Sequence, residues 1–239
     1  MSDASNIIFS KILSMSKKNK PDSNAKADYN RIATEFSTTR VHSWPEIEIF
    51  NTYIKDSWSV LDLGCGNGRL IEAINKKIDY TGIDSSGELI KIAHSKHPKE
   101  KFEIMKMEDL KLKDESFDAV FTIASLHHLP TKELRVKALT EANRVLKNDG
   151  YFFITVWNLW QPKYRKYIWK NLSNMMFKSS GTHFGDTFIP WKDSQRNVLA
   201  ERYYFAYPLN GLRNDLKSSG FNIVEIRKSK WNIYAICKK

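Results

Sequence analysis

The stretch that decides the fold is Val60-Leu61-Asp62-Leu63-Gly64-Cys65-Gly66-Asn67-Gly68-Arg69. An apolar run of strand character ends in glycines at every second position, and apolar residues at helical spacing begin at Leu70. Glycines at a strand-to-helix turn permit tight turning and let a ligand approach the main chain closely. The stretch therefore predicts a ligand site at the carboxyl end of a parallel strand, although the same glycines also fit an ordinary tight turn.

An acidic residue ends the next predicted strand. Asp84 follows the apolar run Tyr80–Ile83, close to the distance at which dinucleotide-binding folds place a carboxylate on ribose hydroxyls. The two acceptor oxygens of a carboxylate match a vicinal diol. The alternative role is an N-cap for the helix that starts near Ser86, and one carboxylate can serve in both roles.

Strand and helix signals alternate on both sides of this unit, which predicts a parallel sheet covered by helices on both faces. After a helix near 209–218, two further strands at 221–226 and 231–237 predict a C-terminal antiparallel hairpin at one edge of the sheet. Residues 1–25 are predicted to form a flexible tail, and residues 26–239 one domain with a basic aromatic insertion at about 158–200 that lacks periodicity. The other predicted strands are 58–63, 80–83, 102–105, 117–124 and 151–156; the other predicted helices include 45–54, 70–74, 89–93 and one around 134–146.

The charge of the chain is concentrated in its last third. The 239 residues contain 38 Lys and Arg against 27 Asp and Glu, a net charge of +11. Residues 157–239 hold 15 of the basic and 5 of the acidic side chains, together with 16 of the 30 aromatic residues. This distribution indicates an anion-facing surface, and its alternatives are solvated lysines and aromatic side chains packed in a core.

Composition excludes several other classes. Two cysteines, Cys65 and Cys237, cannot form a disulfide framework or a four-ligand zinc site, so no metal is expected. No apolar run reaches membrane-spanning length and no signal-peptide pattern opens the sequence, so we expect a cytoplasmic protein without a membrane partner.

The run Leu61–Gly68, followed by Gly82-Ile83-Asp84 and Ser116-Phe117-Asp118, resembles the class I S-adenosylmethionine-dependent methyltransferases. The resemblance implies a Rossmann-like, seven-stranded, mostly parallel sheet with a terminal antiparallel strand, and S-adenosylmethionine as cofactor. Lys106 stands where this superfamily often has an acid for the adenine amino group, and Glu108 is a possible substitute. The cofactor-binding residues that the resemblance implies are Tyr29, Asp62, Gly64, Cys65, Gly66, Asn67, Asp84, Ser85, Met107, Glu108, Ile123 and Ala124.

Further segments resemble one group of these enzymes, the tRNA methyltransferases that esterify 5-carboxymethyluridine at the anticodon wobble position. The matching segments are 29–40 with Trp44-Pro45, 123–131 with Arg135, Val156-Trp157, Arg202-Tyr203-Tyr204 and Trp231-Asn232. The resemblance implies a tRNA anticodon stem-loop as substrate and a small zinc-binding activator protein as partner. It implies catalytic roles for Arg31, Arg40, His127, His128 and Arg135, and RNA contacts for Trp157, Lys163, Arg165, Lys166, Arg202, Tyr203 and Trp231.

Each basic candidate also has an ordinary alternative. Arg31 can pair with Glu35 one helical turn later, His127 can be a core histidine, and Arg135 can be a surface helix residue. The reaction itself needs no general base, because a carboxylate is already ionised near neutral pH. The alternative functions are methylation of a small molecule such as a quinone or lipid precursor, and a catalytically silent tRNA- or protein-binding module.

Overall fold

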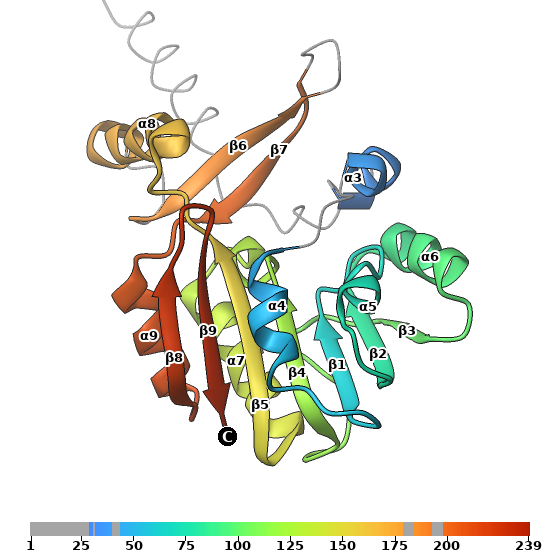
Figure 1. Ribbon diagram of the computed structural model, residues 1–239. Coiled ribbons are helices and arrows are strands. Elements are labelled where there is room, and N and C mark those ends of the chain that lie inside the picture. The colour runs from blue at the N-terminus through green and yellow to red at the C-terminus, as the bar shows by residue number, and fades with distance from the viewer. Residues whose placement is uncertain (1–28, 31, 40–43, 179–183, 193–197) are drawn as a thin grey trace, which may run out of the picture.

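The computed structural model describes residues 29–30, 32–39, 44–178, 184–192 and 198–239. The predicted tail at 1–25 and two predicted catalytic residues, Arg31 and Arg40, lie outside these residues. Figure 1 shows a large twisted sheet flanked by helices, with a smaller hairpin and a helix beyond one end of the strands.

The large sheet has seven strands in the order β3-β2-β1-β4-β5-β9-β8. The first five pair in parallel, β9 is antiparallel to β5, and β8 is antiparallel to β9. This arrangement confirms the predicted Rossmann-like sheet with its C-terminal hairpin. The strands are β1 (Ser59–Leu63), β2 (Asp79–Asp84), β3 (Lys101–Ile104), β4 (Phe117–Ile123), β5 (Leu146–Trp157), β8 (Asn222–Lys228) and β9 (Asn232–Lys238).

Helices bury both faces of this sheet, which explains why its central strands are apolar throughout. On one face, α7 (Lys132–Val145) and α9 (Leu209–Ser218) contribute Leu139 and Leu216 to a core with β4, β5 and β9. On the other face, α4 (Glu46–Asn51) and α5 (Leu70–Ala73) pack through Phe50 and Leu70. The remaining helices before the insertion are α3 (Ala33–Thr39), α6 (Gly87–Lys96) and the 3-10 turn η1 (Leu126–His128).

The insertion is regular, in contrast to its irregular sequence pattern. It contains α8 (Pro162–Lys178) and an antiparallel pair, β6 (Asp186–Lys192) and β7 (Val198–Phe205). These elements bury a small core of their own, formed by Leu159, Ile168, Ile189, Tyr204 and Ala206. In Figure 1 they lie past the end of the sheet toward which β1 points, so they stand over the carboxyl ends of the parallel strands.

The strand β5 is irregular around Asn148-Asp149-Gly150, between the predicted helix around 134–146 and the predicted strand at 151–156. The register between β4 and β5 jumps from Phe117↔Leu146 to Ala119↔Tyr151, and Asp149 has a φ of 63°. A positive φ on an Asp is typical of a turn, so β5 contains a turn-like bulge near its start.

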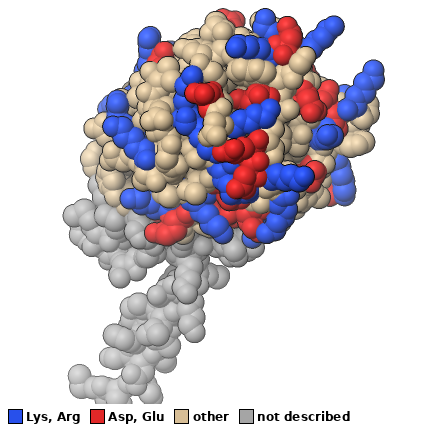
Figure 2. Space-filling model, turned by 90° about the horizontal axis from the view of Figure 1, so that it is seen from below, with Lys and Arg blue, Asp and Glu red and all other residues tan. Residues whose placement is uncertain are grey.

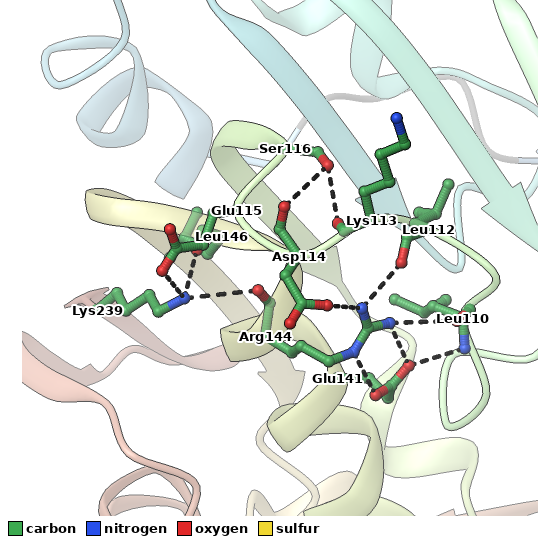
Figure 3. A network of polar contacts seen from close by, with 10 residues as sticks. All are labelled: Leu110, Leu112, Lys113, Asp114, Glu115, Ser116, Glu141, Arg144, Leu146 and Lys239. Carbon is green, nitrogen blue, oxygen red and sulfur yellow. Dashed lines mark hydrogen bonds and ion pairs between the residues drawn. The ribbon is translucent and has the colours of Figure 1, made fainter.

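A polar network lies at the end of the sheet opposite to the insertion, and its residues are drawn in Figure 3. The Arg144 guanidinium donates to the Leu112 carbonyl oxygen at 2.8 Å, to Asp114 Oδ1 at 2.5 Å and to both oxygens of Glu141 at 2.8 Å. These hydrogen bonds hold the pKa of Glu141 below its usual value. Lys239 Nζ donates to the Leu146 carbonyl oxygen at 2.8 Å. The network therefore fastens the loop before β4, and the end of β9, to the end of α7.

Charges of both signs are mixed on the face of the molecule that lies below in Figure 1. Figure 2 shows Lys and Arg side chains interspersed with Asp and Glu across this surface. A surface of this kind does not present one sign of charge to a polyanion.

Candidate active site

A cavity of about 840 Å³ opens at the carboxyl ends of the parallel strands. Its wall joins loops after β1, β2, β3, β4 and β5 to residues of the insertion and of the segment before α4. Ligands of open α/β sheets bind at this edge. The lining residues used below are Tyr29, Trp44, Gly64, Cys65, Gly66, Asn67, Arg69, Asp84, Ser85, Lys106, Met107, Glu108, Ile123, Ala124, His128, Trp157, Gln161, Tyr164, Arg202, Trp231 and Asn232.

The glycine loop after β1 forms the floor of this cavity. Gly64, Gly66 and Gly68 have φ values of 77°, 57° and 79°, a region that side chains rarely adopt. A Cβ added at Gly64 would lie 2.4 Å from the Cβ of Ser125, whose Oγ donates to the Leu63 carbonyl oxygen at 2.9 Å. The loops after β1 and β4 therefore approach so closely that only glycine fits at position 64.

Asp84 lies on the cavity wall at the end of β2. Its Oδ2 accepts a hydrogen bond from the Gly66 N–H at 3.0 Å, and its Oδ1 accepts one from the Ser86 N–H at 2.8 Å. The cap of α6 is Ser86, whose Oγ accepts from the Leu89 N–H, so the N-cap alternative for Asp84 is wrong. A carboxylate oxygen can accept more than one hydrogen bond, so these two contacts are compatible with a ligand hydroxyl at the same carboxylate. The open glycine floor and this carboxylate fit the methionine and ribose parts of S-adenosylmethionine.

The sequence predicts that Asp62 contacts the cofactor directly. In the structure its side chain is buried, and Oδ2 accepts a hydrogen bond from the Tyr80 hydroxyl at 2.8 Å. Burial raises the pKa of Asp62 to about 7. Within the part of the chain that the structure describes, Asp62 is not on the cavity wall. It therefore links β1 to β2 through Tyr80.

All the other predicted cofactor-binding residues line this one cavity. They come from the segment before α4, the glycine loop and the loops after β2, β3 and β4, and Lys106 lies among them beside Met107 and Glu108. The structure thus brings together residues that are up to 95 positions apart between Tyr29 and Ala124. Their contacts with the cofactor stay a prediction.

His128 reaches the cavity and connects three parts of the chain. Its Nε2 lies 2.8 Å from the Tyr29 hydroxyl, and its Nδ1 lies 3.1 Å from the Tyr203 carbonyl oxygen. A carbonyl oxygen only accepts, so Nδ1 carries the proton and Nε2 accepts from Tyr29. His128 therefore fastens both the N-terminal segment and β7 to the loop after β4.

Two predicted catalytic residues, His127 and Arg135, lie beneath the insertion and are not on the cavity wall of the described structure. His127 is fully buried, and its ring stacks on Tyr204 with 5.5 Å between centroids. Burial lowers its pKa well below the usual value, so the ring is neutral. The Arg135 guanidinium lies 3.6 Å from the Phe205 ring centroid and donates to the Leu129 carbonyl oxygen at 2.9 Å. Because β7 covers η1 and α7, both residues hold the insertion in place.

Arg202 projects from β7 into the cavity, although it is only 5% exposed. Its guanidinium lies 4.3 Å from the Trp191 ring centroid, 5.1 Å from that of Tyr204 and 6.0 Å from that of Tyr29. Its Nε has no hydrogen-bond partner in the described residues. A buried cation is costly unless it is paired, so this guanidinium marks a place for an anion.

The other predicted RNA-binding residues are divided between the cavity and the surface. Trp157 and Trp231 line the cavity, and Trp231 is 54% exposed. Tyr203 does not reach the described cavity wall, and its hydroxyl donates to Asp186 Oδ1 at 2.6 Å. Lys163, Arg165 and Lys166 are exposed on α8, outside the wall.

Several cavity residues were not predicted from the sequence as functional candidates. The Arg69 guanidinium lies 3.5 Å from the Trp44 ring centroid, and both residues line the cavity. Gln161 and Asn232 also line it. Trp44 and Asn232 stand inside matching segments, which is the signal that could have identified them, whereas Gln161 lies in the insertion and has no such signal.

Sequence comparisons agree with this site. Residues 61–154 match a family model described as a methyltransferase domain. The chain is 35% identical over 150 residues to the tRNA (carboxymethyluridine(34)-5-O)-methyltransferase of Arabidopsis thaliana, over 59% of this chain and 36% of that protein. It is 27% identical over 231 residues to the protein of the same name from Schizosaccharomyces pombe, covering 88% of this chain and 94% of that one. An uncharacterized protein of Methanocaldococcus jannaschii is 32% identical over 208 residues, covering 83% of this chain and 76% of its own length.

The chain spans only part of several relatives: 36% of the Arabidopsis protein, and 30% and 20% of two mouse proteins. Among the described residues, no helix is long and apolar enough to cross a membrane, and no three His, Cys, Asp or Glu side chains form a group that could hold a metal ion.

Solved structures share the fold. An S-adenosylmethionine-dependent methyltransferase from Methanosarcina mazei superposes with a TM-score of 0.69 at 23% identity, over 83% of this chain and 99% of that one. A putative methyltransferase of Haloferax volcanii, solved in complex with the Trm112 methyltransferase activator, gives a TM-score of 0.61 at 15% identity, over 90% and 96% of the chains. The matching methyltransferase-domain model and the relatives named as methyltransferases, together with this shared fold and with the glycine loop and Asp84 on one cavity, show that the chain belongs to the class I S-adenosylmethionine-dependent methyltransferases.

Proposed function

We propose that this protein transfers the methyl group of S-adenosylmethionine to the carboxylate of 5-carboxymethyluridine at the wobble position of tRNA. The names of the Arabidopsis and S. pombe relatives support this reaction, and the S. pombe relative matches along 94% of its length. The residues Gly64, Gly66 and Asp84 would hold the cofactor at the floor of the cavity.

The observation that carries the proposal is the buried Arg202 guanidinium on the same cavity. A guanidinium grips a carboxylate through two parallel N–H donors, which fixes both its position and its orientation. The rings of Tyr29, Trp191 and Tyr204 surround this guanidinium, and Tyr29 lines the cavity, where a base can stack on an aromatic ring. An anionic, planar substrate group therefore fits this part of the cavity.

The reaction needs no general base, because the carboxylate nucleophile is already ionised. What the site must provide is alignment of this carboxylate with the methyl group. Bound S-adenosylmethionine supplies an electrophilic methyl group on a sulfonium. A carboxylate oxygen forms the new bond to the methyl carbon while the carbon–sulfur bond breaks, and that electron pair stays on sulfur. The carboxylate becomes a neutral ester and the sulfonium becomes a neutral thioether, and no proton is released.

The exposed face of α8 would hold the RNA backbone. Lys163, Arg165, Lys166 and Lys170 are exposed on this helix, and no acidic residue occurs in α8. Trp169 is 64% exposed among them. Cations with an exposed aromatic ring suit phosphates and unstacked bases of an anticodon loop.

A small zinc-binding activator protein is part of the proposal. The strand β3 lies at the edge of the large sheet, and its Ile104 is 59% exposed. An edge strand with an exposed apolar side chain is a site for pairing with another chain. The Haloferax neighbour was solved in complex with a methyltransferase activator, which supports an activator partner for this protein.

The test uses the purified protein with and without a co-expressed zinc-binding activator. Substrates are three anticodon stem-loops that carry 5-carboxymethyluridine, 5-carbamoylmethyluridine or uridine at the wobble position, and S-adenosylmethionine carries a labelled methyl group. We expect label only in the first RNA, in a form released by mild alkali, as an ester is. Label that resists alkali, label on all three RNAs, or no label while calorimetry shows cofactor binding would overturn the proposal.

A further inference from the structure

Asn232 presents a hydrogen-bond acceptor to the cavity, at the start of β9. The residue pairs in register with Trp157 at the end of β5, it is only 5% exposed, and both residues line the cavity. Its main chain is fully engaged, because the N–H donates to Ser229 Oγ at 2.9 Å and the carbonyl oxygen accepts from the Ser229 N–H at 2.7 Å. What remains for a ligand is the side-chain amide.

Glu46 fixes the orientation of that amide. The Glu46 carboxylate is 4% exposed; its Oε2 accepts from Asn232 Nδ2 at 3.0 Å, and its Oε1 accepts from Ser229 Oγ at 3.1 Å. A carboxylate cannot donate a hydrogen bond when ionised, so the nitrogen of the Asn232 amide must face Glu46 and the oxygen must face away. A hydrogen bond to a charged acceptor is also stronger than a neutral one.

The Asn232 Oδ1 atom is therefore available for a ligand. Among the residues that the structure describes, it has no hydrogen-bond partner, and it is not sealed inside the protein. Gln161 also lines the cavity and donates through Nε2 to the Asn158 carbonyl oxygen at 2.9 Å. That residue is only partly buried and is bonded to a neutral loop carbonyl, so its amide is less firmly oriented.

The aromatic wall connects this acceptor to the anion site. The Trp157 ring, next to Asn232 in the sheet, stacks on Tyr204 with 5.1 Å between centroids, and Tyr204 contacts the Arg202 guanidinium. Of these two rings, Trp157 lines the cavity and Tyr204 is fully buried. A pyrimidine on the Trp157 ring, with its C5 substituent held by Arg202, can turn its hydrogen-bonding edge only within a narrow range. An acceptor held rigidly at this wall can then distinguish a ring N–H from a ring nitrogen lone pair.

We infer that Asn232, held in one orientation by Glu46, accepts the N3–H of the substrate uracil and so excludes cytosine, whose N3 is itself an acceptor. The inference rests on the proposed function, since it concerns the base that carries the carboxymethyl group. Asn232 touches the substrate, whereas Glu46 is a positioning residue that acts through it.

The test compares kcat/KM for two anticodon stem-loops, with 5-carboxymethyluridine and 5-carboxymethylcytidine at the wobble position, using the full chain with its activator. For the unchanged protein we expect a preference for the uridine RNA of about 10- to 100-fold, the effect of opposing a buried acceptor with a second acceptor. In Asn232→Ala this preference should fall to within about threefold. Because that variant removes a buried side chain, its melting temperature is measured first.

The variant Glu46→Gln is a more specific test than Asn232→Ala, because the substitution is nearly isosteric. A glutamine can accept from or donate to Asn232, so both orientations of the Asn232 amide become possible and the base preference should fall about tenfold. A merely structural role of Glu46 would lower both rates alike and leave their ratio unchanged. The matched controls are Glu48→Gln, exposed on the same helix, and Asn214→Ala, exposed on α9; both should keep the full preference.

Each outcome decides the inference. A preference that survives in both Asn232→Ala and Glu46→Gln overturns it while the proposed function stands. If the unchanged protein forms no ester on the uridine RNA, the proposed function is wrong and the inference falls with it. Loss of the preference in these two variants but not in the two controls supports it.

Discussion

The hydroxyl of Tyr29 lies 2.8 Å from Nε2 of His128, although 99 positions separate the two residues. This hydrogen bond holds the start of the described chain across the cavity, against the loop that follows β4. The N-terminal segment is thereby part of the wall that the cofactor and substrate would share.

Tyr29→Phe should weaken catalysis without unfolding the protein. The substitution keeps the ring but removes one hydrogen bond, and we expect a roughly 3- to 10-fold fall in kcat/KM for the RNA. Steady-state kinetics with the stem-loop RNA measures it. An unchanged kcat/KM would show that the hydrogen bond between Tyr29 and His128 does not contribute to catalysis.

Gly64→Ala should abolish cofactor binding and destabilise the fold. The added Cβ overlaps Ser125 and forces a side chain into a φ of 77°, at a cost of about 2–4 kcal/mol. Urea unfolding and calorimetry with S-adenosylhomocysteine measure the two effects. Gly87→Ala is the control, because a Cβ there meets only Ile104 at 3.4 Å; equal behaviour of the two variants would contradict the steric argument.

Asp62→Asn should change how stability depends on pH. Burial raises the pKa of Asp62 from 3.8 to about 7, so the folded state binds a proton that the unfolded state releases between these values. The stability contributed by this group is therefore present below about pH 4 and is lost as pH rises to about 7, by about 4 kcal/mol in total. Urea unfolding of both proteins at pH 5 and pH 8 measures the difference between them. We expect the wild type to lose stability relative to Asp62→Asn at the higher pH. If the difference in free energy of unfolding between the two proteins is independent of pH, the pKa of Asp62 is not raised in the folded state.

Arg202→Met should separate substrate binding from cofactor binding. Removing the buried guanidinium that we propose to bind the substrate carboxylate should lower kcat/KM for the RNA about 100-fold. The dissociation constant of S-adenosylhomocysteine, measured by calorimetry, should stay the same. Arg227→Met, on the exposed face of β8, is the control and should leave both quantities unchanged.

Lys163→Ala and Lys166→Ala should each lower the salt dependence of RNA binding. A phosphate contact releases counterions, so each loss should reduce the slope of log K against log salt by about one. Fluorescence anisotropy over a range of potassium chloride concentrations measures the slope. Lys217→Ala, exposed on α9, should not alter it. A slope that is the same in all four proteins would place the RNA elsewhere.

The parallel sheet could be predicted from the sequence because its signals are local. Apolar runs that end at Gly64 and Asp84, and the helical spacing around Leu139, are set by short segments and by burial on both faces. The hairpin of β6 and β7 could not be predicted in this way. Its strands include Pro190 and several polar residues, and its core forms only when Ile189 and Tyr204 meet Ile168 of α8.

The site was predictable as far as it depends on the glycine loop and on Asp84. The positions of His127 and Arg135 were not, because both face elements that arrive later in the chain. A histidine or arginine in a matching segment can point into a cavity or lie under a covering strand, and the sequence pattern is the same in both cases. Conversely, the role that we infer for Asn232 depends on its hydrogen bond to Glu46, 186 positions away, which no local pattern contains.

The position of β9 has a consequence for biosynthesis. Its first residue, Asn232, follows the end of β5 at Trp157 by 75 positions, yet β9 lies between β5 and β8 inside the sheet. During translation, β5 therefore emerges from the ribosome long before its partner, with an unpaired edge that can join a wrong strand. Because Asn232 is made together with β9, a chain stalled before this strand has neither a closed sheet nor the proposed acceptor.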